Sequence, residues 1–407
     1  MGSISAVFQI KRFFSVSHIS AGVIAVLVGY TSAAVIIFQA AEAAGASPAQ
    51  ISSWLWALGL GMGLSSIALS WYFRAPVLTA WSTPGAALLV TALSGATVNE
   101  AAGIFIFSSA LIFLCGITGI FEKMMRHVPM SLAGGMLAGV LLQFGMDLFK
   151  VLNAELLLVG TMLAVYLLIK YALPRHVIPL VLLTGGGIAF FQGQLQLDGL
   201  SWQLSAPVWM SPVFNMGQMI GIGIPLFIVT MASQNVPGVA ALRANGYHTP
   251  VSPLIATTGF TGLMLAPFGG FAFNLAAITA AICQGKEAGE DPKKRYLATM
   301  WAGGFYLLTG VFGASIVALF AAFPAELVMA LAGLALLGTI GNSLSASLAE
   351  PNEREAALLT FLITASGIQL AGISSAFWGL VIGLLAYHLQ KSFVPYLKRA
   401  DTGRQAA

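Results

Sequence analysis

The chain has 407 residues, of which 58% are hydrophobic and only 8% are charged, and its mean hydropathy is +0.89. A soluble domain carries about 25% charged residues, so this composition excludes a soluble globular protein and indicates a polytopic membrane protein with almost no soluble part. The net charge of +4 does not indicate a nucleic-acid partner, and Cys115 and Cys283, both in apolar segments, indicate neither a disulfide framework nor a metal site.

The first apolar run extends from Val16 to Ala41 and follows Lys11 and Arg12. It is too long for the hydrophobic region of a signal peptide and has no small-residue cleavage site after a short core, so we expect it to be retained as a membrane span. About 20 apolar residues cross a bilayer. On this criterion the chain contains fourteen predicted spans, at 17–41, 51–72, 77–93, 100–121, 129–148, 155–171, 176–192, 217–241, 253–265, 268–283, 296–322, 325–343, 356–372 and 375–391.

The distribution of positive charge supports this count. With the N-terminus in the cytoplasm, the fourteen spans place every lysine and arginine except Lys150 on the cytoplasmic side, as the positive-inside rule requires. Both termini are then predicted to be cytoplasmic. The outer loop 193–216 lacks lysine and arginine and contains Trp202 and Trp209, so we expect it to lie along the outer membrane interface.

Two predicted spans are interrupted by proline, glycine and polar residues, at 79–87 and at 266–274. Broken backbone at membrane depth is tolerated only inside protein or beside a cavity, and a pair of such breaks in corresponding positions indicates a transporter binding site. In the first, 79–83 is predicted to be extended, with Ser82 or Thr83 as the N-cap and Pro84 at the first position of a half-helix that continues from Gly85.

In the second interrupted segment, Pro267, Gly269 and Gly270 break the backbone. We expect a half-helix to begin near Phe271 or Ala272, which would place Asn274 one turn into it. The two halves of the chain also repeat a pattern of glycines and prolines: Gly45 and Pro48 with Gly246 and Pro250, Pro84 with Pro267, and Pro129 with Pro324. Seven spans in each half is an odd number, so the halves must run in opposite directions, which is the inverted repeat of secondary transporters.

These features predict a substrate site between the two half-helices. Two facing helix N-termini present unpaired N–H groups and partial positive charge, and so favour an anion such as a carboxylate. Nearby aromatic side chains could sandwich a flat ring; the alternative for each of them is packing against other helices. These aromatic residues are Trp81, Phe268, Phe271 and Phe273.

Polar side chains inside span 217–241 add a second group of candidates. Ser233, Gln234 and Asn235 interrupt an apolar helix, Gln39 occupies the corresponding place in the first span, and Asn274 is a similar candidate. Polar groups at membrane depth are costly and usually face a cavity or another helix. The alternative reading is interhelical hydrogen bonding.

No aspartate, glutamate, lysine, arginine or histidine lies clearly at the middle of a predicted span. Four acidic residues near span ends are expected to be interfacial, with a proton relay as the alternative: Glu42, Glu100, Asp147 and Glu326. The sequence therefore predicts no metal site, no catalytic residues and no enzyme activity. An anion channel stays open as an alternative of another class.

Three motifs make the chain similar to the bacterial benzoate membrane transport family of benzoate/proton symporters, and the similarity extends over essentially the whole chain. They are Gln234-Asn235-Val236-Pro237-Gly238-Val239, Leu242-Arg243-Ala244-Asn245-Gly246-Tyr247 and Ala266-Pro267-Phe268-Gly269-Gly270-Phe271-Ala272-Phe273-Asn274. The family is related in fold to nucleobase/ascorbate transporters and sulfate permeases. The resemblance implies an all-α polytopic membrane protein with fourteen transmembrane segments in a seven-plus-seven inverted repeat, and a short extended segment before the half-helices of spans 3 and 10.

The resemblance also implies a core domain and a gate domain, each built from both halves. The core would comprise 1–125 and 196–322, and the gate 126–195 and 323–407. Nucleobase carriers of this fold hold their substrate with a glutamate on span 8 and another on span 10. Here these neighbourhoods offer Gln234 or Asn235 and 270–274, so the acids are absent, which argues for an anionic substrate and leaves the proton-carrying residue open.

The resulting prediction is a secondary transporter of the bacterial inner membrane that imports benzoate or a similar aromatic carboxylate with protons. It would need no cofactor besides the proton gradient, and its partners would be the substrate, protons, lipid and a second copy in a homodimer. The predicted substrate-binding residues are Trp81, Ser82, Thr83, Gly85, Gln39, Ser233, Gln234, Asn235, Gly269, Gly270, Phe271, Phe273 and Asn274. An inorganic-anion or nucleobase carrier on the same fold stays open.

Overall fold

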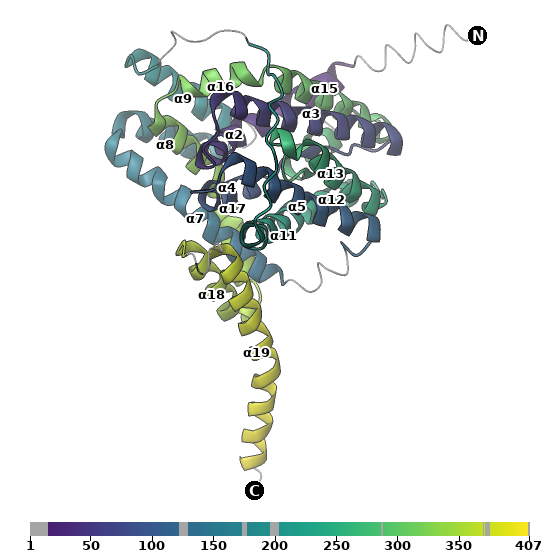
Figure 1. Ribbon diagram of the computed structural model, residues 1–407, viewed down its shortest axis with the longest axis vertical. Coiled ribbons are helices and arrows are strands. Elements are labelled where there is room, and N and C mark those ends of the chain that lie inside the picture. Colours follow the sequence, from purple (N-terminus) through teal and green to yellow (C-terminus); the bar gives the residue numbers. More distant parts are fainter. Residues whose placement is uncertain are drawn as a thin grey trace, which may run out of the picture.

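A computed structural model describes residues 15–121, 129–172, 177–195, 203–285, 288–368, 370 and 375–405 of the chain. These residues are mostly helical (Figure 1), and the described part of the molecule contains one sheet, of two short strands.

The first half of the chain forms α2 (Val16–Ala43), α3 (Pro48–Phe73), β1 (Thr79–Ala80), α4 (Thr83–Ala92), α5 (Val98–Thr118), α7 (Met130–Ala154), α8 (Leu156–Lys170) and α9 (Val177–Phe191). In the second half, a broken helical stretch comprises α10 (Met216–Gln218), the π-helix η2 (Met219–Gly223), α11 (Ile224–Thr230), the π-helix η3 (Met231–Asn235) and α12 (Val236–Ala244).

The rest of the second half comprises α13 (Val251–Leu265), the 3-10 turn η4 (Ala266–Phe268), β2 (Asn274–Leu275), α14 (Ile278–Gln284), the 3-10 turn η6 (Pro292–Lys294), α15 (Tyr296–Val311), α16 (Gly313–Ala321), α17 (Ala325–Leu348), the 3-10 turn η7 (Pro351–Glu353), α18 (Arg354–Ala365) and α19 (Ser375–Gln405). The last of these, drawn in yellow, extends away from the body of the molecule (Figure 1).

Helices lie in each of the predicted spans, but 217–241 and 296–322 are each divided among more than one helix. Among the described residues, six helices are long and apolar enough to cross a membrane, and α2 raises this to seven if its two segments, which meet at 41°, count as one span. The protein is therefore a helical polytopic membrane protein.

Helices from the two halves interleave. α3 packs along α15, and α5 packs along α13, while α7 packs along α17. Close helix contact in these pairs depends on residues without side chains: a Cβ on Gly59 of α3 would lie 2.5 Å from the Cα of Gly310 on α15, and one on Gly116 of α5 would lie 2.3 Å from the backbone nitrogen of Ala256 on α13. Small residues let membrane helices approach closely and gain dispersion contacts that lipid cannot supply.

The strands β1 and β2 join the two interrupted segments. They pair in antiparallel orientation, with Thr79 opposite Leu275 and Ala80 opposite Asn274. Hydrogen bonds also tie β1 to α3, because the hydroxyl oxygens of Ser65 and Ser66 lie 2.6 and 2.8 Å from Oγ1 of Thr79. The extended segments implied before both half-helices are thus present, and each satisfies the backbone of the other.

The predicted start of the second half-helix is wrong. α14 begins at Ile278 rather than near Phe271, and Asn274 lies in β2 instead of one turn into a helix. Gly269, with φ +91°, and Ala272, with φ +46°, turn the backbone to the left-handed region on either side of Phe271. A right-handed helix cannot pass through these conformations, so the extended segment continues to the pairing with β1.

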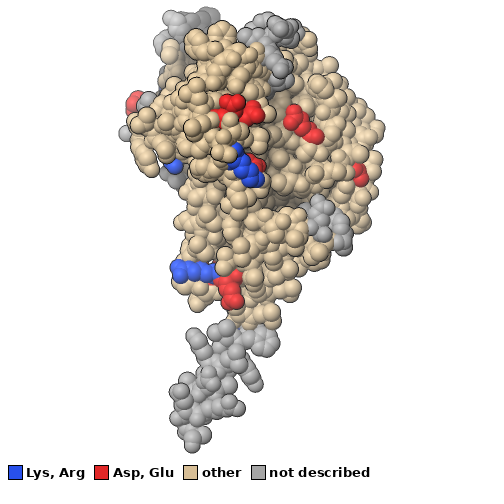
Figure 2. All heavy atoms as spheres, turned by 90° about the vertical axis from the view of Figure 1, so that its left-hand side faces the viewer, with Lys and Arg blue, Asp and Glu red and all other residues tan. Residues whose placement is uncertain are grey.

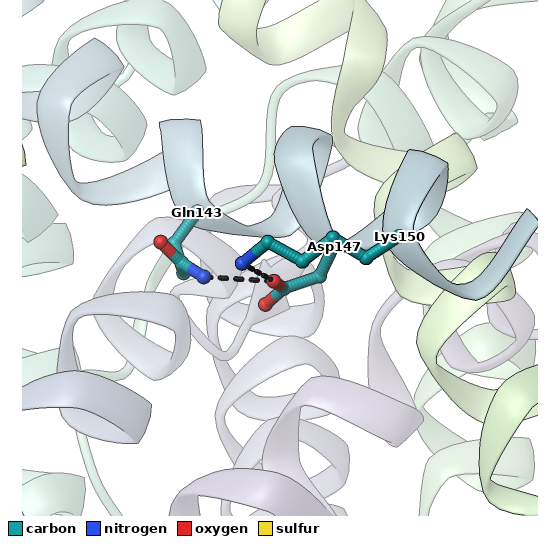
Figure 3. Close-up of polar contacts among 3 residues, drawn as sticks. All are labelled: Gln143, Asp147 and Lys150. Atoms are coloured by element: carbon teal, nitrogen blue, oxygen red, sulfur yellow. Dashed lines mark hydrogen bonds and ion pairs between the residues drawn. The ribbon is translucent and has the colours of Figure 1, made fainter. Parts of the chain in front are cut away.

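Charged residues are few and scattered on the face of the molecule shown in Figure 2. Lys150, which departs from the positive-inside pattern, is paired: its Nζ lies 2.8 Å from Oδ1 of Asp147, one helical turn away on α7. The same oxygen accepts a 2.7 Å hydrogen bond from Nε2 of Gln143 (Figure 3). The Asp147 carboxylate therefore offsets the positive charge of Lys150.

Candidate functional site

A cavity of about 530 Å³ lies where the two half-helices begin, and its volume is typical of a small-molecule site. Its lining includes the first interrupted segment, the residues 276–279 that follow the second, and residues of α2, α3, η3, α12 and α15. Residues of α7 and α17 complete the lining. No aspartate, glutamate, lysine, arginine or histidine is among the described residues that line it.

The start of α4 forms one polar edge of the cavity. Thr83 and Pro84 line it. Ser82 is fully buried and acts as the N-cap, because its Oγ accepts a 3.0 Å hydrogen bond from the N–H of Gly85. The predicted N-cap is therefore confirmed. The N–H of Gly85 is bonded to Ser82, and Pro84 has no N–H to offer. Ser82 and Gly85 do not line the cavity, so they shape this edge through the backbone.

The start of α14 lacks a side-chain cap, unlike the start of α4. Ala276, Ala277 and Thr279 line the cavity. α14 has no side-chain cap, and its first backbone bond runs from the N–H of Ala281 to the carbonyl of Ala277. The N–H groups of 278–280 therefore precede the helical hydrogen-bond ladder. Of these three residues, Thr279 lines the cavity.

The polar run of the broken stretch divides between two roles. Ser233 and Gln234 line the cavity from η3. Asn235 is fully buried outside the lining: its Oδ1 accepts a 2.9 Å hydrogen bond from the N–H of Leu275, and its Nδ2 donates to Sδ of Met231 at 3.1 Å. A π-helix is a rare insertion that often marks a functional site. Here it turns Ser233 and Gln234 to the cavity while Asn235 holds β2.

Trp81 is the predicted aromatic residue that reaches the cavity. Its ring packs edge-on against Tyr30, with centroids 4.7 Å apart, and its backbone N–H donates to Sδ of Met62 at 3.2 Å. The contact with Tyr30 orients the indole, so Trp81 presents an apolar surface to the cavity.

The other predicted aromatic residues pack in the protein interior. Phe271 lies against Trp54 and Phe105, with centroid distances of 5.8 and 5.1 Å. Phe273 is 1% exposed and fills the space over Gly61 of α3. Neither lines the cavity, and Phe268 also lies outside the lining and packs against tryptophans. The alternative reading, packing against other helices, is the one that the structure shows for these three rings.

Three further candidates shape the second interrupted segment without lining the cavity: Gly269, Gly270 and Asn274. Gly269 approaches the indole of Trp54, and a Cβ on Gly270 would lie 2.7 Å from Cβ of Leu265. Asn274 is fully buried, and its Nδ2 donates a 3.0 Å hydrogen bond to the carbonyl of Ala272. These residues fix the path of the backbone into β2.

Gln39 lies at a different place. It lines a second cavity, of about 870 Å³, between the end of α2, the segment 203–208 and the start of α17. Glu42, one turn further along α2, lines the same space. The repeat suggested that Gln39 would correspond to Gln234, but the two side chains do not share a cavity.

Several lining residues are not among those predicted from the sequence: Met62, Thr279, Tyr306, Leu137 on α7 and Asn342 on α17. Thr279 lies only a few residues beyond the predicted break, so a later helix start would have included it. Tyr306 is a polar aromatic residue within an apolar span, which is a signal at membrane depth. The residues on α7 and α17 have no local signal, because their role depends on how distant helices pack.

A buried glutamine connects the elements that form the cavity wall. Gln284, the last residue of α14, is fully buried. Its Nε2 donates to the carbonyl of Pro76 at 3.3 Å, just before β1, and its Oε1 accepts from Nδ2 of Asn245 at 3.2 Å, just after α12. Nη1 of the nearly buried Arg295 donates to the Gln284 carbonyl at 2.8 Å. Gln284 therefore connects α14 with the segments next to β1 and α12, at a place outside the cavity lining.

We expect Gln284→Leu to destabilise the protein by about 1–3 kcal/mol, because it leaves buried polar groups without partners. The apparent melting temperature of the purified protein in detergent checks this. Gln192→Leu, at an exposed position, is the matched control and should leave the melting temperature unchanged. Equal melting temperatures for Gln284→Leu and the unmodified chain would contradict the role given to Gln284.

A family model described as benzoate membrane transport protein matches residues 12–389 of the chain. The chain is 51% identical to the inner membrane protein YdcO of Escherichia coli (strain K12) over 378 residues, which cover 92% of this chain and 97% of that protein. It is 43% identical to the benzoate membrane transport protein of Acinetobacter baylyi (strain ATCC 33305 / BD413 / ADP1) over 380 residues, which cover 93% of this chain and 96% of that protein.

Two solved structures share the fold. The transmembrane domain of the cyanobacterial bicarbonate transporter BicA matches with a TM-score of 0.62 and 13% identity, over 91% of this chain and 96% of that chain. SLC26A9 matches with a TM-score of 0.62 and 14% identity, over 92% of this chain, which spans 65% of that chain. At these identities the likeness concerns the fold alone.

Proposed function

The chain belongs to the benzoate membrane transport protein family, and from this premise we propose that it imports benzoate or a similar aromatic carboxylate together with protons. It is a membrane transport protein and not an enzyme. The observation that carries the proposal is the cavity at the start of both half-helices, which combines hydrogen-bond donors and an aromatic surface with a lining free of charged side chains among the described residues.

The carboxylate would bind where the two half-helices start. There Thr83, Thr279 and Gln234 line one cavity, and α14 begins beside it without a side-chain cap. Such donors stabilise an anion without a cationic side chain, whose pairing would make release slower. The ring would lie against Trp81 and Met62. Ser82, Gly85, Asn235 and Asn274 would contribute by holding the backbone in place.

The architecture proposed for transport has fourteen spans in a seven-plus-seven inverted repeat. The packing of α3 on α15 and of α5 on α13 supports it, because these pairs join spans 2 and 11 and spans 4 and 9, which the repeat exchanges. The core domain, 1–125 and 196–322, would carry the half-helices. The gate domain, 126–195 and 323–407, would supply α7 and α17, and movement between them would expose the cavity to each side in turn.

The proposed setting is the bacterial inner membrane with both termini in the cytoplasm, supported by the positive charges of the predicted inner loops and by the printed name of the Escherichia coli relative. In this orientation the cavity lies toward the cytoplasm, since Met130 at the start of α7 and Ala346 near the end of α17 border it. A homodimer is proposed as well.

Uptake by the purified chain in liposomes tests the function. We expect saturable accumulation of labelled benzoate under an inward proton gradient, and loss of accumulation when a protonophore removes the gradient. Uracil and sulfate serve as competitors for the rival carrier classes and should not reduce uptake. Absence of saturable benzoate uptake, or unitary conductance in planar bilayers, would overturn the proposal.

A further inference from the structure

Gly29 of α2 borders the cavity at a position where helix packing does not require glycine. A Cβ on Gly22, two turns earlier on the same helix, would lie 2.8 Å from the backbone nitrogen of Ala302 on α15, so close packing accounts for that glycine. A Cβ on Gly29 would instead make ordinary contacts, 3.4 Å from Oη of Tyr306 and 3.8 Å from Cγ2 of Thr279. The absence of a side chain at Gly29 therefore leaves space within the cavity.

The space beside Gly29 has one polar side. Tyr306 on α15 and Thr279 on α14 both line the cavity. The atom of Tyr306 nearest to the Cβ position of Gly29 is its hydroxyl oxygen, whereas Thr279 presents its methyl carbon Cγ2 there. The Tyr306 ring is held by its neighbours, because it is 2% exposed and its centroid lies 6.2 Å from that of Tyr30. We call the space bordered by Gly29, Thr279 and Tyr306 the notch. A phenol can both donate and accept a hydrogen bond, so the notch suits a small group with the same property.

A benzoate ring carries no polar group besides its carboxylate, which the proposed site already satisfies elsewhere. We propose that the cavity also takes aromatic carboxylates that carry a ring hydroxyl, and that the hydroxyl occupies the notch beside Gly29, where the Tyr306 hydroxyl hydrogen-bonds to it. This inference rests on the proposed function and specifies its substrate class: hydroxybenzoates besides benzoate. A buried polar group favours a hydrogen-bonding substituent over an apolar one of the same size.

The test compares matched ligands on the full-length chain. In liposomes, unlabelled ortho-, meta- and para-hydroxybenzoate and the corresponding methylbenzoates compete with labelled benzoate. We expect at least one hydroxybenzoate to compete at a concentration no higher than benzoate itself requires, and better than its methyl counterpart. Tyr306→Phe, which removes the hydroxyl, should reduce this hydroxyl-over-methyl preference about three- to tenfold.

Gly29→Ala is the second variant, and it should fold because its Cβ makes only ordinary contacts. By filling the notch it should lower the same preference by a similar factor. Gly304→Ala, on α15 with open space around it, is the control and should keep the preference of the unmodified chain. The inference is overturned if hydroxybenzoates compete no better than methylbenzoates, or if Tyr306→Phe and Gly29→Ala both keep the preference.

Heat stability separates this inference from the proposed function. Hydroxybenzoates should raise the apparent melting temperature of the detergent-purified chain more than their methyl counterparts, and Tyr306→Phe should remove the difference. This result stands or falls without any transport measurement. Binding of hydroxybenzoates with no uptake of benzoate would contradict the proposed function alone, whereas uptake of benzoate with equal binding of both ligand sets would contradict the notch alone.

Discussion

Replacing Gly269 by alanine should abolish the folded protein. The backbone at Gly269 has φ +91°, and a Cβ there would lie 1.9 Å from Cδ1 of Trp54. The indole cannot move aside, because it is fully buried between Phe105 and Phe271 and its Nε1 donates to Sδ of Met210 at 3.4 Å. Left-handed strain and overpacking together should cost about 3–5 kcal/mol.

The measurement is the yield of monodisperse protein by size-exclusion chromatography in detergent, followed by the melting temperature of any folded fraction. Gly95→Ala is a matched control, since Gly95 has φ +87° but no neighbouring atom within 4 Å of its Cβ position. It should show the conformational strain alone, about 1–2 kcal/mol. A Gly269→Ala protein as stable as the Gly95→Ala protein would contradict the contact with Trp54.

Although Gln234 and Asn235 are adjacent, Gln234→Ala should impair transport and Asn235→Ala should impair stability. Gln234 faces the cavity, so its loss should reduce benzoate uptake about ten- to a hundredfold through the loss of a hydrogen bond to a charged ligand, with the melting temperature unchanged. Asn235 accepts the hydrogen bond from the Leu275 N–H in the protein interior. Its loss should lower the stability by about 1–3 kcal/mol.

Uptake rates and melting temperatures of the two variants, measured on the same preparations, check this pair of expectations. Benzoate should also raise the melting temperature of Asn235→Ala, because its ligand-facing groups are intact, but should raise that of Gln234→Ala far less. If both variants lose stability equally and both respond equally to benzoate, the division of roles between the two side chains is wrong.

The first interrupted segment could be predicted closely from sequence because its signals are local. Ser82 and Pro84 are start signals that act within one turn, and the helix begins at Thr83, with Ser82 as its N-cap and one residue before the predicted first position at Pro84. The polar run was recognised for the same reason, since Ser233 and Gln234 stand out in an apolar helix. The different roles of Asn235 and Gln234 could not be predicted, because they depend on the π-helix η3, which the amino-acid composition does not indicate.

For the second interrupted segment, the sequence predicts the position of the break but not the conformation of the chain that follows it. Proline and glycines at 267–270 indicate a break, yet the chain stays extended as far as β2 because its backbone pairs with β1, in the other half of the molecule. Phe271 and Phe273 look like ligand contacts in the sequence and are interior packing residues in the structure. Which side of an extended segment meets the cavity is decided by that distant pairing.

The pairing of β1 with β2 also constrains the order in which the protein folds. When the ribosome has delivered only the first half, the backbone of Thr79 and Ala80 lacks the strand that satisfies it in the finished molecule. The segment of β1 therefore cannot reach its final conformation until β2 has been synthesised. The first half made alone should leave 79–82 open to proteolysis, and adding the second half as a separate chain should protect it.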